Sequence, residues 1–187
     1  MSDKPFEFVL LGQPITKKNS ARLIRKQARL LPSPQYMEYE ARCRNALNIL
    51  RQRVKLPYFD MPVQMTCRYY LRDRKSYPDL IGLAQATADI ISDEYKSINH
   101  KKTLMCRWIL SDDRIIKSWD GTKIAGIDKY NPRTEIIIMP LKVDLKTETD
   151  PYIIRKIKER QQENLFDEKP KESPYADYIN NLLNKYD

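Results

Sequence analysis

The stretch YPDLIGLAQATADIIS, residues 77–92, most constrains the fold of this chain. Pro78 and Asp79 mark the start of a helix, and the residues that follow to about Ile91 are almost all apolar. Twenty residues beyond Ser92 a second acidic spot, LSDDRI, precedes a stretch typical of a strand. Strand-like segments also come before the helix, so we expect a helix that packs on a sheet.

The rest of the chain supplies the other elements of that sheet. A second helix is expected to open at Ser33-Pro34, because Tyr36, Tyr39, Cys43 and Leu47 recur at the spacing of one buried helical face. The polar residues 93–104 and 120–133 are expected to form an irregular connector and a long loop. The strand-like segments are residues 6–12, 62–72, 105–110, 114–119 and 134–140.

This order of elements predicts an α+β fold with a mixed β-sheet and two packed helices, followed by a C-terminal helical extension. At 187 residues the chain is long enough for one compact domain with a real core. Composition changes after Pro140, so we expect a domain over residues 1–141 and a tail over residues 142–187.

The chain is basic, and its charge is unevenly spread. The net charge is +9, and from Lys142 onward the sequence holds nine Lys or Arg against ten Asp or Glu. Residues 1–141 therefore hold 25 cations (34 less 9) and 15 carboxylates (25 less 10), a charge of +10. A basic body of this kind favours a polyanionic partner, nucleic acid first. A solvated basic surface is the alternative interpretation.

Membrane and metal–thiolate classes are disfavoured by the same sequence. No apolar run approaches the roughly 20 residues that span a bilayer, and the apolar patch near the N-terminus is too short for a signal peptide. We therefore expect a cytoplasmic protein with no membrane contact. Cys43, Cys67 and Cys106 lie far apart without C-x-x-C spacing, and His100 is the single histidine. We expect buried thiols in a reducing compartment rather than a zinc site.

The densest positive run lies in residues 15–31, which we expect to form a loop or a hairpin. A second basic group comes shortly before Asp79. Phosphate contacts position a protein on DNA without reading its sequence, so these cations suit a protein that selects DNA by shape. A solubilising loop is the alternative. The candidate DNA-binding residues are Lys17, Lys18, Arg22, Arg25, Lys26, Arg29, Arg72, Arg74, Lys75 and Lys117.

Carboxylates in such a basic chain suggest a site for a hard cation. Magnesium takes one or two carboxylates plus waters and substrate phosphates, and beside a phosphodiester it activates water. Asp79 and Asp89 are about 15 Å apart on an intact helix, so they cannot both bind one ion directly. Asp79 could instead meet Asp112 or Asp113 at the edge of a neighbouring strand. An ordinary helix cap and an ordinary turn are the alternatives.

Two segments, PDLIGLAQATADII and SDDRIIKSWDGTKIAGIDKYNPRTEIIIMP, resemble the RusA family of Holliday-junction resolvases. The family pattern is roughly P-D-L-D-N-L-x-K, a later Asp in the same helix, a D-D pair and a closing strand. Together with LGQPITKKNSARL and PSPQYMEYEARCRNAL, the likeness spans about residues 6–141, with about ten residues inserted around Tyr95 to Cys106. Members are small, homodimeric, magnesium-dependent endonucleases of phages and prophages that cut four-way DNA junctions.

The resemblance implies roles for individual side chains. Asp79 and Asp113 match metal-binding aspartates of the family, with Mg²⁺, or Mn²⁺ in its place, as the cofactor. Asp112 and Asp89 match supporting acidic positions. Lys117 is a candidate supporting cation, because it lies four residues beyond Asp113 and could face the same side of a strand. A solvated strand residue is the alternative for Lys117.

The chain departs from the family pattern at Ile81, where the second motif aspartate falls, and at Gln85, where the functional lysine falls. These positions are i,i+4 on one helical face, so a charged pair has been exchanged as one unit. Either Gln85 and Asp89 re-form the site with Asp79 and Asp113, with Gln85 orienting a water, or the fold is kept and cutting is weakened. We favour retained activity because the four aspartates remain.

The tail lies outside the resemblance. Asp150 and Pro151 predict the start of a helix there. Residues Gln162–Phe166 fit the Q-x-x-L-F pattern of peptides that bind bacterial sliding clamps, although an ordinary helix end is the alternative. A short amphipathic end, residues 175–186, is a candidate dimer contact.

The sequence thus predicts a magnesium-dependent endonuclease that acts as a homodimer on branched DNA. Two-fold symmetry would place two active sites on two strands of a symmetric junction. The alternatives are a junction-binding protein on the same fold that does not cut, and an interaction module that works through the tail.

Overall fold

The structure is a computed structural model that describes residues 4–17, 22–24, 29–75, 77–144 and 146–167. The chain divides into two compact units, Met1–Val143 and Asp144–Asp187. The fold is of the mixed α+β class, as the order of elements in the sequence predicts.

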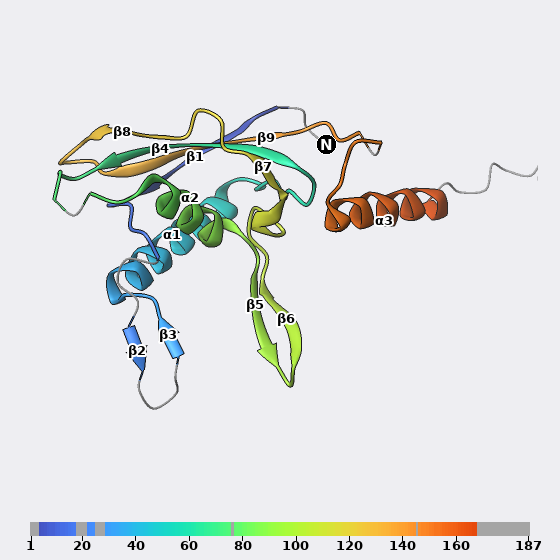
Figure 1. The fold of residues 1–187 in the computed structure, drawn as a ribbon, viewed down its shortest axis with the longest axis horizontal. Helices are drawn as coiled ribbons and strands as arrows, with labels where there is room; N and C mark the ends of the chain where they lie inside the picture. Colours follow the sequence, from blue (N-terminus) through green and yellow to red (C-terminus); the bar gives the residue numbers. More distant parts are fainter. Residues whose placement is uncertain (1–3, 18–21, 25–28, 76, 145, 168–187) are drawn as a thin grey trace, which may run out of the picture. The chain divides into compact units, whose positions relative to one another are not determined.

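The first unit is built on a mixed five-stranded sheet (Figure 1). Strand β9 (Arg133–Pro140) lies between β1 (Phe6–Leu11) and β4 (Val63–Leu71) and is antiparallel to both. On its other side, β4 pairs in parallel with β7 (Ile116–Ser118) near its start and with β8 (Lys123–Ile127) near its end. Strand β4 is therefore the centre of the sheet.

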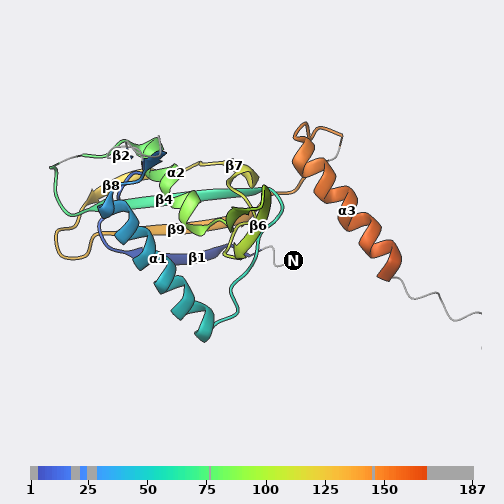
Figure 2. The same cartoon turned by 90° about the horizontal axis from the view of Figure 1, so that it is seen from below.

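Two helices cover one face of this sheet, as Figure 2 shows from the helix side. Helix α1 (Pro34–Arg53) begins after Ser33, whose hydroxyl accepts a hydrogen bond from the N–H of Tyr36. Helix α2 (Leu80–Ile91) begins after Asp79. Both starts agree with the sequence prediction, because each rests on a side chain that caps the first turn.

Alternation along β4 places one set of side chains under the helices. Tyr69 of β4 hydrogen-bonds Thr87 of α2 at 3.0 Å between the hydroxyl oxygens, and Tyr39 of α1 meets Thr134 of β9 at 3.4 Å. These buried polar contacts fix both helices on the sheet in one register. The buried side chains of β4 are Val63, Met65, Cys67, Tyr69 and Leu71.

The three cysteines carry free thiols in the structure. Cys43 and Cys67 are buried, as predicted, whereas Cys106 is only half-buried. Burial raises the pKa of the Cys43 thiol to about 11 and that of Cys67 to about 12. Both groups are therefore neutral thiols of low nucleophilicity at physiological pH.

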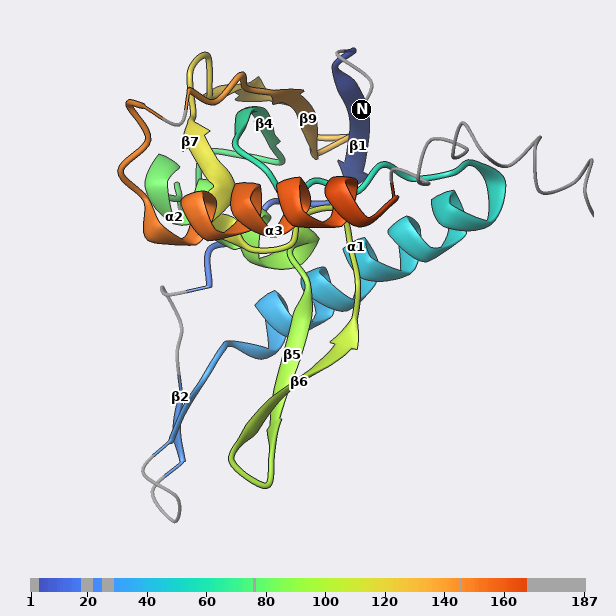
Figure 3. The same ribbon diagram turned by 90° about the vertical axis from the view of Figure 1, so that its right-hand side faces the viewer.

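Two hairpins extend away from the sheet on the helix-covered side (Figures 1 and 3). Strands β2 (Arg22–Ile24) and β3 (Arg29–Leu31) form the first, within the basic run where a loop or hairpin is predicted. Strands β5 (Glu94–Ile98) and β6 (Lys101–Cys106) form the second.

Several predicted boundaries were wrong. Residues 93–104 are not an irregular connector, since most of them lie in β5 and β6, and residues 120–133 are not one long loop, since β8 lies within them. Most side chains of the second hairpin are exposed, so its strands lack the apolar alternation that marks a half-buried strand. The acidic motif opens a short 3₁₀ helix, Asp113–Ile115, ahead of β7 rather than a strand.

The second unit contains helix α3 (Pro151–Asp167). The carboxylate of Asp150 accepts a hydrogen bond from the N–H of Tyr152 at 2.9 Å, and the carbonyl of Asp150 accepts from the N–H of Ile154 at 3.0 Å. Asp150 therefore caps the helix as predicted, with Pro151 at the first helical position. Among the described residues, no helix has the length and apolar character needed to cross a bilayer.

Candidate active site

Asp79 lies at the start of α2 and caps it. Its side chain accepts a hydrogen bond from the N–H of Gly82, and its carbonyl accepts from the N–H of Leu83 at 3.2 Å. A Cβ added to Gly82 would lie 2.7 Å from Oδ2 of Asp79, so the carboxylate is folded closely over the first turn. Of the alternatives for Asp79 left open by the sequence, the structure shows the helix cap.

Asp89 lies near the other end of α2, ten residues along the chain and about 15 Å away by helical rise. Its Oδ2 is 2.7 Å from Nζ of Lys17, which comes from the segment after β1. Lys17 and Asp89 are 72 residues apart in the sequence. One of the predicted DNA-binding lysines therefore faces a carboxylate of the acidic group.

The backbone explains why Asp112 and Asp113 lie beside Asp89. The N–H groups of Ile109 and Leu110 both donate to the carbonyl of Ile91 at 3.0 Å, and the N–H of Asp93 donates to the carbonyl of Leu110 at 2.9 Å. These bonds hold the chain against the last turn of α2. The residues that follow Leu110 are therefore placed next to the end of the helix.

A cavity of about 260 Å³ marks this meeting point. Its lining comes from α1, α2, the base of the β5–β6 hairpin and the acidic motif, and it includes Lys17, Arg44 and Lys102 as cations. We call this cavity the acidic pocket. Its carboxylates are Glu40, Asp89, Asp93, Glu94, Asp112 and Asp113.

Burial in the acidic pocket, together with the charges around it, raises the pKa of Asp113 above its usual range. Burial is the largest cause, followed by a hydrogen bond to Asp112, the charge of Asp112 and the charge of Asp89, while Arg114 acts in the opposite direction. The negative charges of Asp112 and Asp89 disfavour ionisation of Asp113 unless a cation is added. The structure thus brings together Asp89, Asp112 and Asp113, and leaves Asp79 at the far end of α2.

The remaining carboxylates of the acidic pocket have structural partners. Arg44 lies 3.0 Å from Glu40 and 3.0 Å from Glu94, and so ties α1 to the base of β5. Asp93 accepts hydrogen bonds from the Tyr58 hydroxyl at 2.8 Å and from the N–H of Trp108 at 2.7 Å. The sequence does not single out these residues as members of a site. The i,i+4 spacing of Glu40 and Arg44 is the one local signal that points to any of them.

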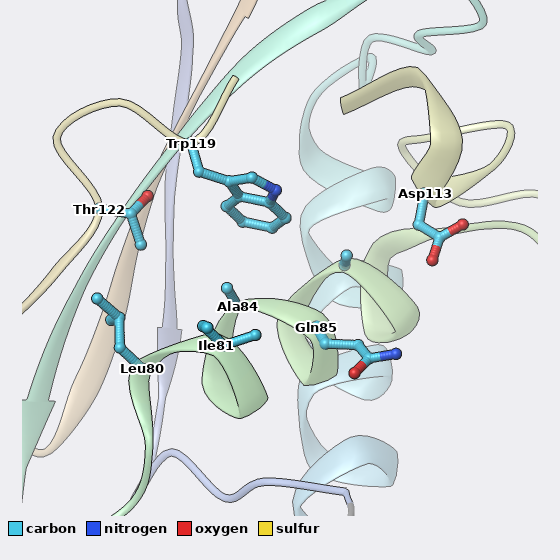
Figure 4. Close-up of a pocket in the computed structure, with 8 residues that line it drawn as sticks. Leu80, Ile81, Ala84, Gln85, Asp113, Trp119 and Thr122 are labelled. Carbon is cyan, nitrogen blue, oxygen red and sulfur yellow. The ribbon is translucent and has the colours of Figure 1, made fainter. Parts of the chain in front are cut away.

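The face of α2 that carries Ile81 and Gln85 lines a second cavity, of about 390 Å³ (Figure 4). Gln85 lies between Ile81 and Asp113 in this view, and Trp119 lies across the cavity from Ile81. Ile81 is 80% exposed, although it is a large apolar side chain. Ile81 therefore adds an exposed apolar side chain to the cavity that Asp113 also lines.

A basic groove lies near the start of α2. Arg72 and Lys75 line a cavity of about 490 Å³ together with Gln13 and Thr16. The N–H of Arg72 donates to Oε1 of Gln13 at 2.6 Å, which joins the end of β4 to the segment after β1. Arg74 is exposed in the same turn. The groove therefore brings the turn that carries Arg72 and Lys75 beside the segment that leads to Lys17.

The other predicted DNA-binding residues are placed in different ways. Lys18, Arg25 and Lys26 lie outside the described residues, and Arg22 and Arg29 lie on the β2–β3 hairpin. Lys117 is exposed on β7, but Asp113 belongs to the 3₁₀ helix. The strand alternation that was expected to place Lys117 and Asp113 on one side does not exist.

No three His, Cys, Asp or Glu side chains among the described residues are grouped so that they could hold a metal ion. Magnesium does not require three, since one or two carboxylates suffice when waters and phosphates complete its shell. Asp112 and Asp113 offer two adjacent carboxyl groups, and the charge of Asp112 helps to raise the pKa of Asp113. Their oxygen chemistry and their unfavourable mutual charge fit such an ion.

Comparison with known proteins gives no family for this chain. No protein-family model matches it, and no curated protein is significantly similar to it. In the tail, Gln162 lies on α3, while the side chains of residues 163–166 and all of residues 168–187 lie outside the described residues. The sliding-clamp motif and the amphipathic end stay predictions.

Proposed function

We propose that this protein is a magnesium-dependent endonuclease that cuts branched DNA such as four-way junctions. The observation that carries the proposal is the convergence of Asp89, Asp112 and Asp113 from two distant segments in a chain of net charge +9. A nuclease needs cations to bind phosphates and a small acidic site to hold a metal ion.

The proposal assigns the metal to Asp113 and Asp112, with Asp89 in support. When bound, magnesium would polarise the phosphodiester and activate water. Gln85, on α2, lines the same cavity as Asp113, where its amide is suited to orient a water molecule (Figure 4). Lys17 balances the charge of Asp89 and is near enough to the pocket to meet a phosphate.

The basic groove supports a DNA substrate. Arg72 and Lys75 lie beside the segment that leads to Lys17, so a phosphate backbone could run from the groove toward the acidic pocket. Contacts of this kind read the shape of the backbone rather than its sequence. We propose that the protein acts as a homodimer, because a symmetric junction offers two equivalent strands. We also propose that it works in the cytoplasm, where its buried thiols stay reduced.

Cleavage of a labelled four-way junction with Mg²⁺ tests the function. Asp113→Asn and Asp112→Asn are each expected to lower the cleavage rate by about 10²-fold or more, the scale of one lost electrostatic contact in an active site. Asp120→Asn is the matched control, because Asp120 is exposed in the turn before β8 and outside the acidic pocket. Its rate should equal that of the wild type.

Three outcomes are informative. Cleavage that survives both Asp112→Asn and Asp113→Asn would refute the site assignment. Absence of any cleavage of branched, duplex or single-stranded DNA by the wild type would refute the proposed endonuclease activity. Mass measurement in solution, by light scattering, tests the homodimer, and a monomer with full activity would contradict that part.

A protein that binds junctions without cutting them is the second candidate. Two observations favour it: Ile81 places an apolar side chain where the family has a motif aspartate, and Lys17 already pairs with Asp89. This candidate predicts tight junction binding by the wild type, equal binding by Asp113→Asn and no cleavage by either. The same cleavage and binding assays therefore separate the two.

A further inference from the structure

The β5–β6 hairpin is a narrow arm joined by a tight turn. Asn99 and His100 connect the strands, and their φ angles of 51° and 61° are both positive. A two-residue loop with two positive φ angles is the type I′ turn, whose twist matches that of an antiparallel ribbon. Figure 3 shows the arm extending past the helices from its base beside α2.

The arm carries cations and no carboxylate beyond its base. From Tyr95 to Arg107 the sequence contains four lysines or arginines and no Asp or Glu. The carboxylate at the base of the arm, Glu94 at the start of β5, is paired with Arg44 at 3.0 Å. All of these cations are exposed; they are Lys96, Lys101, Lys102 and Arg107.

Contacts within this chain do little to stabilise the arm. Ile98 and Met105 are each 47% exposed, and Leu104 is 40% exposed. An isolated two-stranded hairpin is at best marginally stable in water. Apolar side chains that the fold leaves about half exposed on a marginal hairpin therefore point to a partner that covers the arm, and the charge of the arm selects a polyanion.

One face of the arm is directed toward the acidic pocket. The register pairs Tyr95 with Leu104 and Ser97 with Lys102, so these four residues share one face by strand alternation. Nζ of Lys102 lies 4.2 Å from the centre of the Tyr95 ring, and both residues line the acidic pocket. Lys96 and Lys101 belong to the opposite face.

We propose that the β5–β6 hairpin is a DNA-binding arm whose lysines contact the phosphate backbone of the branched substrate. Lys102 and Tyr95 hold the backbone at the mouth of the acidic pocket, and Lys96 and Lys101 contact phosphates across the outer face. A two-stranded ribbon is narrow enough to enter the major groove of a duplex arm. The inference rests on the function proposed above only in taking branched DNA as the partner.

Salt-dependent binding tests the arm separately from cleavage. A fluorescently labelled four-way junction is titrated in EDTA, so that nothing is cut, with the triple variant Lys96→Gln, Lys101→Gln and Lys102→Gln. The matched control removes three exposed lysines elsewhere, with Lys55→Gln, Lys123→Gln and Lys142→Gln, and has the same net charge. Circular dichroism and thermal unfolding establish that both variants fold.

The arm variant is expected to lose about three phosphate contacts. The slope of log K against log salt should then fall by about 2.7, and affinity at about 0.15 M salt should fall by about 100-fold. The control should change both by much less. Replacing the same three arm lysines by Arg keeps the charge and should keep wild-type binding.

The possible results separate the arm from the function. If the arm variant binds like the control while the wild type binds and cuts the junction, the arm proposal is overturned and the proposed function stands. If the arm variant loses affinity as expected while the wild type does not cut, the DNA-binding role of the arm is supported and the proposed endonuclease activity is refuted. A wild type that does not bind junction DNA at all would overturn both.

Discussion

The cap at the start of α2 allows a test of whether Asp79 is a structural or a metal-binding residue. Asp79→Ala removes the side chain that accepts from Gly82 and should lower the free energy of unfolding by about 1 kcal/mol, within a range of about 0.5–2. For a chain of 187 residues this is a loss of about 2–4 °C in the melting temperature. Asp79→Asn should cost almost nothing, because Asn caps a helix as well as Asp.

The crowding between Asp79 and Gly82 predicts an energetic coupling between these two positions. The Cβ of Gly82→Ala would lie 2.7 Å from Oδ2 of Asp79, so the carboxylate must turn away and the cap is lost. Alanine in a helix regains about 0.5–1 kcal/mol relative to glycine, which leaves this variant close to the wild type in stability. In the Asp79→Ala background no carboxylate is left to displace, so the same substitution should stabilise by that amount. The double variant should therefore be about as stable as Gly82→Ala alone, with a coupling of about 1 kcal/mol between the sites.

Urea unfolding of the four proteins measures the coupling, and junction cleavage by Asp79→Asn measures the role of the charge. Full cleavage by Asp79→Asn is expected if the carboxylate only caps the helix. Two results would contradict a purely structural role for Asp79. One is strict additivity of the two substitutions. The other is loss of cleavage in Asp79→Asn at unchanged stability, which would return Asp79 to the metal site that the family resemblance implies.

Three further predictions concern the two cavities along α2. Because folding raises the pKa of Asp113, the stabilising contribution of this group is present in acid and is lost as pH rises through the folded pKa. In EDTA, Asp113→Asn should therefore have a higher melting temperature than the wild type at about pH 7 and the same melting temperature at about pH 3. Equal melting temperatures at neutral pH would contradict this prediction. Lys17→Gln should strengthen magnesium binding, measured by calorimetry, by up to about fivefold, since it removes the cation that competes for Asp89; weaker metal binding would speak against a metal at this pocket. Ile81→Asp combined with Gln85→Lys should raise junction cleavage by about tenfold or more if the altered face limits the chemistry, and neither single substitution should do so.

The helices of this chain could be predicted because the residues at their starts carry side chains that cap a helix. Ser33, Asp79 and Asp150 each cap a helix through a side-chain oxygen, and each precedes a clear helical pattern. The buried face of α1 followed from the spacing of Tyr36 and its successors for the same reason. Such signals lie within a few residues of the structure they specify.

The arrangement of the acidic pocket could not be predicted, because it depends on long-range contacts. The salt bridge between Lys17 and Asp89 joins residues 72 apart, and the position of Asp113 is set by backbone bonds between Ile91 and the segment near Leu110. Backbone bonds leave no residue-specific trace in the sequence. The β5–β6 hairpin was missed because its side chains face water on both sides, and a polar strand resembles a polar loop.

The strands with which β1 and β4 pair also determine the order in which the chain can fold. In the described residues, β1 pairs with β9 alone, and β4 pairs with β7, β8 and β9, so each bond of the main sheet involves a residue beyond position 115. At a synthesis rate of about 5–20 residues per second, β4 waits roughly 4–15 seconds for β9 to be made. During that time its buried face and the apolar side of α2 have no sheet to cover them. Such non-local pairing also favours slow folding. The nascent chain should therefore depend on chaperones until β9 has left the ribosome.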